Sequence, residues 1–391
     1  MENQKKIRIG IDARFYGPLG KGLGRYTQEI TDRVVELDPN SDYVIFLSPE
    51  NFDSFQPRGT NCKKVKVNIR WYSWREQVFL PFCFYREKLD LLHFTHFNVP
   101  IFYRGAFVVT IHDLILTKFS SLKATLLSPW LYRLKNLAYK LVIRHAVHHS
   151  QKIITVSKFT AADIANQFKI SAEKIEVTYE GVADNFLSVS ASGSGILEKY
   201  QISEPFFLYV GSAYPHKNLE GLLKVFSLFQ NQHASKHISL VLVGKEDYFY
   251  LQIKKMVEQL RINKVFFPGY VPDQDLSVFF SRALAYVFPS LYEGFGLPPL
   301  EAMSQGCPVL SSSEGSLPEI LGSAALYFNP YSTEDFLKKL EEISDNQELR
   351  KQKKEAGFER VKFFNWQNCA KETLIIYKKC LQANVKTKSQ K

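Results

Sequence analysis

Apolar runs and amphipathic stretches alternate along the chain. The run from Ile7 to Ile11 leads into a glycine-rich loop, and a stretch with helical apolar spacing follows from Tyr26 to Leu37. The second half repeats this order, with an apolar run from Phe206 to Val210, a glycine, a polar loop and another amphipathic stretch. Strand and helix signals that alternate in this way predict parallel sheets covered by helices.

Further runs of strand length support this prediction. They read YVIFLS, DLLHFTH, FVVTIHD and KIITVS in the first half, and ISLVLVG, VFFPGYV, LAYVFPS and CPVLSSS in the second. Each run is almost continuously apolar, as expected for strands that are buried on both faces. The fold class predicted is therefore α/β, with two Rossmann-like, doubly wound domains that face each other across a cleft.

The domain boundary is predicted at the small polar stretch SVSASGSG, from Ser188 to Gly195, which is typical of a flexible linker. Residues 1–190 then form the first domain, expected on the acceptor side, and 200–362 form the second, expected to bind a nucleotide. Residues 363–391 are predicted to be a terminal helix and tail that pack back on the first domain.

Composition limits the class of protein. The 391 residues are 45% hydrophobic and 23% charged, which suits a soluble protein of two domains. The five cysteines are irregularly spaced without a C-x-x-C pair, which favours a reducing compartment and argues against a zinc site. The start MENQKKIRIGID shows no secretory apolar region, and no apolar run is long enough to span a bilayer. We expect a cytoplasmic protein.

The net charge of +11 suggests an anionic partner. No acidic residue occurs from Leu114 to Ala162, whereas basic residues lie throughout region 118–158. We expect this region to dock on an anionic membrane surface at the inner face of the cell membrane. The alternative is that its apolar stripe packs on the sheet and the basic residues only face water. Nucleic acid is not an expected partner, because no recognition module is present.

The stretch from Pro289 to Ser313 carries the clearest chemical signal. Two carboxylates, Glu293 and Glu301, are separated by seven residues that include a Gly-Phe-Gly turn and a Pro-Pro pair. The prolines suit the first turn of a helix, and Gly306 is predicted to end that helix. A helix start that follows a strand offers free amides to an anion. Two carboxylates beside such a cradle suit a ligand that is part sugar and part diphosphate.

These residues resemble glycosyltransferase family 4, whose retaining enzymes have two Rossmann-like domains in the GT-B fold. The resemblance covers nearly the whole chain. It rests on EGFGLPPLEAM around Glu293, GSAYPHKN after the second-half strand, HD at His112–Asp113 and VSKFTAADI at Ser157. The opening DARFYGPLGKGLGRYTQEI is similar to the subgroup that contains many bacterial mannosyltransferases. The resemblance implies a retaining hexosyltransferase in cell-surface polysaccharide or glycolipid synthesis. We expect it to be metal-independent, because a lysine and a helix amino end can offset the charge of a leaving diphosphate.

The resemblance also implies roles for individual residues. Glu293, His112 and Lys217 would be catalytic: Glu293 at the donor sugar, His112 beside the transferred sugar and Lys217 on the diphosphate. The other donor-binding positions would be Gly22 in the loop Gly17–Gly24, Gly211, Ser212, Gly294, Phe295, Gly296, Leu297 and Glu301, the last on the ribose. No cofactor is expected; the donor substrate is expected to be GDP-mannose, and the acceptor a glycan or a lipid-linked sugar.

The chain departs from the family pattern in the loop that carries Lys217. Many relatives have arginine where this chain has Ser212, and others have arginine where it has His216. Lys217 is therefore expected to be the only fixed cation of this loop, with Arg14 or Arg25 as candidates to assist it.

Other polar residues have structural interpretations. Asp113 is predicted to cap a turn, Ser157 to cap the helix that follows it, and Asp273 to cap a helix with Asp275 in its first turn. The D-Q-D pair at Asp273 and Asp275 is not interpreted as a metal site. His93 and His96 are expected in the cleft or the core.

Two alternatives to GDP-mannose transfer stay open. One is a glycosyltransferase that uses a UDP-hexose. The other is a nicotinamide-dependent dehydrogenase on the same fold, although Gly20, Gly22 and Gly24 do not form the G-x-G-x-x-G fingerprint of such enzymes.

Overall fold

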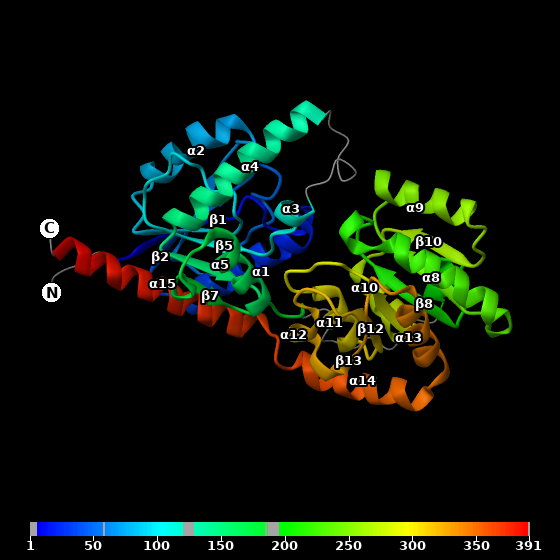
Figure 1. Ribbon diagram of the computed structural model, residues 1–391. Coiled ribbons are helices and arrows are strands. Elements are labelled where there is room, and N and C mark those ends of the chain that lie inside the picture. The colour runs from blue at the N-terminus through cyan, green and yellow to red at the C-terminus, as the bar shows by residue number, and fades with distance from the viewer. Residues whose placement is uncertain (1–5, 58, 120–128, 184–185, 187–194, 390–391) are drawn as a thin grey trace. The chain divides into compact units, whose positions relative to one another are not determined.

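The structure is a computed structural model that describes residues 6–57, 59–119, 129–183, 186 and 195–389. The chain forms two compact units (Figure 1). Unit 1 comprises Met1–Gly181 and Trp366–Lys391, and unit 2 comprises Val182–Asn365. The predicted linker lies outside the described residues, apart from Gly195.

Unit 1 is built on a parallel sheet in which seven strands are described. They are β1 (Arg8–Asp12), β2 (Asp42–Leu47), β3 (Cys62–Lys66), β4 (Leu91–Phe94), β5 (Phe107–Ile111), β6 (Lys152–Thr155) and β7 (Ile175–Val177). Their order is β3-β2-β1-β4-β5-β6-β7. The order reverses between β1 and β4, and ligands of such sheets bind beyond the carboxyl ends of the strands at this switch point.

Helices cover both faces of this sheet. They are α1 (Lys21–Leu37), α2 (Trp74–Arg86), α3 (Ile115–Lys118), α4 (Pro129–His149), α5 (Lys158–Phe168) and α15 (Trp366–Ser389), with short 3₁₀ turns η1 (Pro18–Gly20) and η3 (Ala172–Lys174). Buried residues of α2, α4 and α5 share one core cluster with β2, β4, β5 and β6. The terminal helix α15, red in Figure 1, contacts α1, β4 and β6, so it belongs to unit 1.

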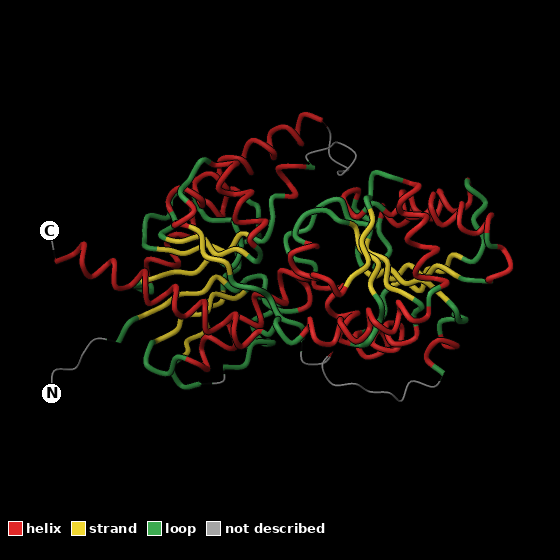
Figure 2. The backbone as a smooth tube through the Cα atoms, turned by 60° about the horizontal axis from the view of Figure 1, so that its bottom comes forward, coloured by secondary structure: helices red, strands yellow, loops and turns green. Residues whose placement is uncertain are grey.

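Unit 2 repeats the same plan. The described strands of its parallel sheet are β8 (Phe206–Val210), β9 (Ser239–Val243), β10 (Val265–Gly269), β11 (Ala285–Phe288), β12 (Val309–Ser312) and β13 (Ala325–Phe328). Their order is β10-β9-β8-β11-β12-β13, so the switch point lies between β8 and β11. Figure 2 shows the strands of each unit enclosed by helices, which explains why the strand sequences are apolar on both faces.

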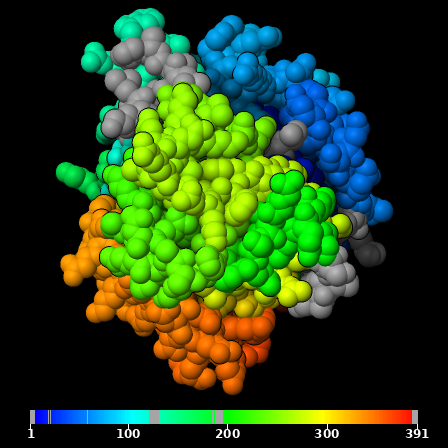
Figure 3. All heavy atoms as spheres, turned by 90° about the vertical axis from the view of Figure 1, so that its right-hand side faces the viewer, coloured from blue at the N-terminus to red at the C-terminus, as the bar shows by residue number. Residues whose placement is uncertain are grey.

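The helices of unit 2 are α7 (Ile196–Lys199), α8 (Leu219–Gln232), α9 (Tyr248–Gln259), α10 (Asp273–Arg282), α11 (Leu297–Ser304), α12 (Leu317–Leu321), α13 (Thr333–Asp345) and α14 (Gln347–Val361). Short 3₁₀ turns are η4 (Pro215–Lys217), η5 (Ala234–Lys236) and η6 (Gly322–Ala324). Figure 3 looks onto unit 2, where α8 and α9 in green and α13 and α14 in orange form much of the visible surface.

The first helix begins earlier than the sequence predicts. Apolar spacing indicates a start at Tyr26, but α1 begins at Lys21, so Gly22 and Gly24 lie in its first turn and not in a loop. A Cβ atom on Gly24 would lie 2.0 Å from the Gly17 carbonyl oxygen, which explains the glycine there. A Cβ atom on Gly22 would have no neighbouring atom within 4 Å, so packing does not explain why this residue is a glycine.

Candidate functional site

Two loops meet at the switch point of unit 2. One follows β8 and runs from Gly211 to Asn218, and the other follows β11 and leads into α11. The backbone N–H of Leu291 donates to the carbonyl of His216 at 2.7 Å and joins the two loops. The side chains that follow these two strands are therefore brought together at the edge where ligands of such sheets bind.

Lys217 and Glu293 form an ion pair across these loops. The Lys217 Nζ lies 2.6 Å from Glu293 Oε1, and the two side chains are only 17% and 10% exposed. An ammonium group has three N–H donors, so Lys217 can bind Glu293 and still offer donors to another anion. The pair thus places a cation for a phosphate next to a carboxylate that can accept hydrogen bonds from sugar hydroxyls.

Helix α11 begins directly after this pair. Its N-cap is Gly296, with φ +104°, which has no side chain of its own to cap the helix. A Cβ atom on Gly296 would also lie 2.9 Å from Leu317, so both the dihedral and the space favour glycine. The first turn holds Leu297, Pro298 and Pro299 and carries no acidic residue. The positive end of the helix dipole is therefore not neutralised from within the first turn.

A third loop supports Glu293 from behind. The Ser316 hydroxyl donates to the carbonyl oxygens of Glu293 at 3.1 Å and Phe295 at 3.0 Å. Gly315 has φ +66°, and a Cβ atom there would lie 3.0 Å from the Glu293 backbone nitrogen. The loop after β12 thus fixes the backbone of the Glu293 turn, a role that sequence analysis missed. Its signal was a glycine and a serine three and four residues after the end of β12.

The predicted donor residues Gly211 and Ser212 lie at the end of β8. The Tyr209 hydroxyl donates to the Ser212 carbonyl at 2.7 Å, and the Tyr250 hydroxyl donates to the Gly211 carbonyl at 2.8 Å. A Cβ atom on Gly211, whose φ is +155°, would lie 2.8 Å from the Tyr209 hydroxyl. Buried tyrosines therefore set the backbone at the start of the Lys217 loop.

Glu301 lies in the second turn of α11 and is buried. Burial, and after it the negative charges of Glu301 and Glu293, raise the pKa of Tyr286. The Tyr286 hydroxyl donates to the Val210 carbonyl at 3.1 Å, at the end of β8. The two carboxylates of the motif therefore lie on either side of the start of α11 in the sequence, and both act on the same buried phenol.

His216 does not add a second positive charge to this loop. Burial, assisted by the charge of Lys217, lowers the pKa of His216 to about 4, so the ring is neutral at pH 7. Because Lys217 is the other basic residue of the loop from Gly211 to Asn218, it supplies the positive charge of this loop.

In unit 1, His112 lies just beyond β5. Its Nδ1 is 3.2 Å from Glu180 Oε1, its Nε2 is 3.1 Å from the Thr95 carbonyl, and its ring packs edge-to-face on Tyr26. Burial lowers the pKa of His112, but the hydrogen bond to Glu180 and the charge of Glu180 oppose this, and the net direction is upward. Sequence analysis selected His112 and missed Glu180, which follows another strand, β7.

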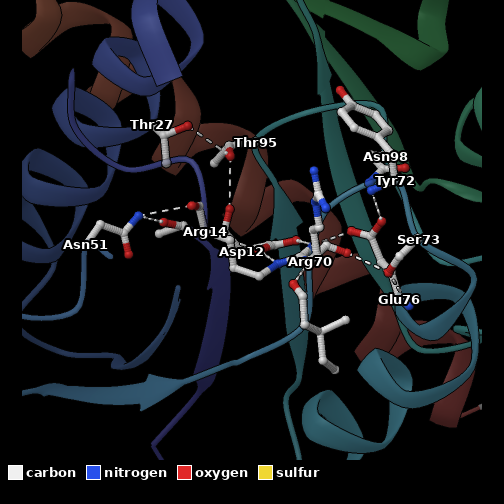
Figure 4. Close-up of polar contacts among 12 residues, drawn as sticks. Asp12, Arg14, Thr27, Asn51, Arg70, Tyr72, Ser73, Glu76, Thr95 and Asn98 are labelled. Carbon is white, nitrogen blue, oxygen red and sulfur yellow. Dashed lines mark hydrogen bonds and ion pairs between the residues drawn. The ribbon is translucent and has the colours of Figure 1, made fainter. Parts of the chain in front are cut away.

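Arg14 is not available to a ligand, contrary to one expectation from the sequence. Figure 4 shows its guanidinium between two carboxylates. Its Nε and Nη2 donate to Asp12, both at 2.8 Å, and Nη2 donates to Glu76 at 2.7 Å. Glu76 also accepts from Asn98 at 2.7 Å and from the Tyr72 backbone at 2.8 Å. This buried cluster fixes the loop after β1 against the start of α2.

Most structural interpretations of polar residues are confirmed. Ser157 accepts from the Thr160 amide at 3.1 Å and caps α5, and Asp113 accepts from the Ile115 amide at 2.9 Å. His93 is fully buried in the core of unit 1. The Asp273 prediction is wrong, since Pro272 is the N-cap of α10 and Asp273 is its first helical residue.

Asp275 and His96 both have hydrogen-bond partners within the chain. Asp275 lies in the first turn of α10 and pairs with Lys199 at 2.8 Å and Tyr200 at 2.9 Å. His96 accepts from or donates to the Tyr72 hydroxyl at 2.8 Å. Among the residues that the structure describes, no group of three or more His, Cys, Asp or Glu side chains could hold a metal ion.

Sequence comparison identifies both halves of the chain. The family described as "Glycosyltransferase Family 4" matches residues 20–186, and "Glycosyl transferases group 1" matches residues 197–360. The chain is 32% identical over 239 residues to O-antigen chain mannosyltransferase B of Escherichia coli, covering 60% of this chain and 62% of that relative. It is 28% identical over 282 residues to O-antigen chain mannosyltransferase RfbU of Salmonella typhimurium, covering 70% and 71%.

A solved structure supports the fold. HepE of Anabaena, in complex with UDP and glucose, superposes with a TM-score of 0.72 at 16% identity and covers 96% of this chain and 100% of its own. Such identity shows the fold alone, which is that of the GT-B glycosyltransferases with two parallel-sheet α/β domains. With both halves matched and the motif assembled at the switch point of unit 2, the chain belongs to glycosyltransferase family 4.

Proposed function

We propose that the protein is a retaining hexosyltransferase that moves mannose from GDP-mannose to a glycan or lipid-linked acceptor in cell-surface polysaccharide or glycolipid synthesis. The observation that carries this proposal is the Lys217–Glu293 pair at the switch point of unit 2, next to the amino end of α11. The two mannosyltransferase relatives support the choice of sugar.

The proposed chemistry follows from the charges of this corner. The bond between the sugar C1 and the β-phosphate oxygen breaks, and a bond between C1 and an acceptor oxygen forms on the same face. Lys217 and the helix amino end offset the negative charge that grows on the leaving diphosphate, so no metal ion is required. The acceptor hydroxyl proton passes to the leaving phosphate. Glu293 orients the sugar hydroxyls, and Glu301 binds the ribose.

A UDP-hexose is the principal alternative donor, and HepE was solved with UDP. The experiment that distinguishes the donors is a screen of GDP-, UDP-, ADP- and dTDP-sugars for hydrolysis and for a rise in melting temperature. We expect GDP-mannose to give the largest response in both measurements. A response to NAD and to none of these donors would favour the dehydrogenase alternative instead.

We further propose that unit 1 delivers the acceptor from an anionic membrane surface. Helix α4 exposes a continuous apolar stripe with helical spacing, formed by Trp130, Leu134, Leu137 and Leu141, which are 50–74% exposed. Its inward face is a different set of residues, Ile143, Ala146 and Val147. These four side chains are exposed among the described residues, whereas Ile143 of the same helix packs inward.

Helix α2 adds a second stripe over the same face of the sheet. Its exposed large apolar residues are Trp74, Val78, Phe79, Phe82 and Tyr85. Helix α2 has one acidic residue, Glu76, which is buried against Arg14, and α4 has no acidic residue. The exposed basic residues of the two helices are Arg75, Arg86, Arg133, Lys135, Lys140 and Arg144. Apolar area together with positive charge is what an interfacial helix needs. Among the described residues no helix is long and apolar enough to cross a membrane.

Cosedimentation with vesicles tests this docking. Binding is expected to require anionic lipid, to weaken as salt rises, and to fall when Phe82 and Leu137 are changed together to Ser. The matched control is Leu228→Ser on α8 of unit 2, which is 40% exposed. Equal binding of neutral and anionic vesicles would contradict the proposal, and so would loss of binding in the control alone.

A further inference from the structure

We infer that Glu180 holds His112 as an imidazolium cation whose two N–H groups are both committed, so that His112 supplies positive charge to the reaction and does not act as its base. The role in the reaction rests on the proposed function, whereas the charge state of His112 does not. Glu180 is in this sense a positioning residue.

The inference starts from the partners of the His112 ring. Nδ1 faces a carboxylate oxygen of Glu180 at 3.2 Å, and Nε2 faces the backbone carbonyl of Thr95 at 3.1 Å. A carboxylate and a carbonyl are both acceptors, so each ring nitrogen must carry a proton for its hydrogen bond to form. A neutral imidazole has a single N–H and would leave one nitrogen lone pair facing an acceptor oxygen. The protonated ring satisfies both contacts.

Three elements create this environment. His112 follows β5, Thr95 follows β4 and Glu180 follows β7, and all three positions lie at the carboxyl edge of the sheet in unit 1. Glu180 is 5% exposed, so water screens its charge weakly and the pair is stronger than a surface pair. The Tyr26 and His112 rings pack in a T-shaped arrangement at a centroid distance of 4.5 Å, which helps to hold the imidazole in place.

The other ionisable groups that face His112 do not cancel this effect. Asp113, the next residue, adds negative charge and also favours the cation. His96, whose ring centroid lies 6.5 Å away, and His93 in β4 have pKa values lowered by burial, so both rings are neutral at pH 7. The upward direction of the His112 pKa agrees with this sum of charges.

The chemical consequence concerns the proton of the acceptor hydroxyl. A ring with both nitrogens protonated has no lone pair with which to accept that proton. In the proposed transfer, the C1–oxygen bond to the diphosphate breaks, the C1–oxygen bond to the acceptor forms, and the hydroxyl proton must go to the leaving phosphate. A cation stabilises the negative charge that develops on a diphosphate as its bond to C1 breaks, so this is the contribution that a protonated His112 can make to the proposed transfer.

The test is nuclear magnetic resonance of the full-length protein with ¹⁵N-labelled histidine. The His112 signals are assigned by their disappearance in His112→Gln. We expect both ring nitrogens of wild-type His112 to show the protonated pattern at pH 7, and we expect its titration to move to lower pH in Glu180→Gln. The matched control is Glu173→Gln, an exposed glutamate of the same unit, which should leave the titration unchanged.

Kinetics provide the second measurement once the donor is known. Glu180→Gln is expected to lower kcat about 10- to 100-fold, as the loss of one charge-assisted contact would, and to move the high-pH limb of the kcat profile to lower pH. A neutral His112 ring in the wild type at pH 7, or an unchanged titration in Glu180→Gln, would overturn the inference. If the protonated ring is observed but no nucleotide sugar is used, the charge state stands and the proposed function fails.

Discussion

Replacement of Lys217 by Ala should affect two separate quantities, the free energy of unfolding and the affinity for a nucleotide ligand. At 2.6 Å and an effective dielectric constant of about 20, the attraction is about 6 kcal/mol before the cost of desolvating both charges. Loss of the lysine leaves the Glu293 carboxylate largely buried without its partner. Because both side chains keep some exposure, we expect a loss of about 2 kcal/mol in the free energy of unfolding, below the ~3–5 kcal/mol of a fully buried pair.

Donor binding should fall independently of stability. A charge-assisted hydrogen bond contributes about 1.5–3 kcal/mol, so the Kd of GDP should rise about 10- to 150-fold in calorimetry, with UDP measured in parallel. The double variant Lys217→Met with Glu293→Gln should regain most of the lost stability, because no buried charge is left alone, and should still bind GDP weakly. Lys255→Ala, an exposed lysine on α9, is the matched control. Wild-type affinity for both nucleotides in Lys217→Ala would refute the assignment of the diphosphate site.

Three further outcomes are expected. Transfer should continue in excess EDTA, because Lys217 and α11 offset the diphosphate charge; complete loss that Mn²⁺ or Mg²⁺ restores would reopen the metal alternative. Arg14→Met should lower the free energy of unfolding in urea by about 3–5 kcal/mol, since it strands two buried carboxylates, and a loss under about 1 kcal/mol would contradict the structural role of the cluster. The pKa of His112 is higher in the folded protein than the value of about 6.5 in the unfolded chain, so protonation of His112 stabilises the fold. This stabilisation is complete below a pH of about 6.5 and is lost as the pH rises through the pKa of the folded state. Urea unfolding from pH 6 to 9 should show that loss in the wild type and less of it in Glu180→Gln.

The candidate site of unit 2 was predictable from sequence because its signals are local. Gly296 adopts a positive φ, and the prolines that follow it suit the first turn of a helix, so the start of α11 could be predicted from a few neighbouring residues. The same holds for Ser157 and Asp113, whose side chains bind amides two or three residues away. The start of α1 was missed because apolar spacing is weak in its glycine-rich first turn.

The sequence by itself therefore determined the alternation of strands and helices, the switch-point loops and the residue types of the candidate site in unit 2. The tertiary structure decided which charges pair, because partners far apart in the chain meet only when the strands align. The Arg14 guanidinium forms an ion pair with Glu76, which lies 62 residues away in the sequence. The His112 ring forms a hydrogen bond with Glu180, which lies 68 residues away. Periodicity likewise cannot say which of two apolar faces of α4 is buried, since that depends on which face the sheet covers.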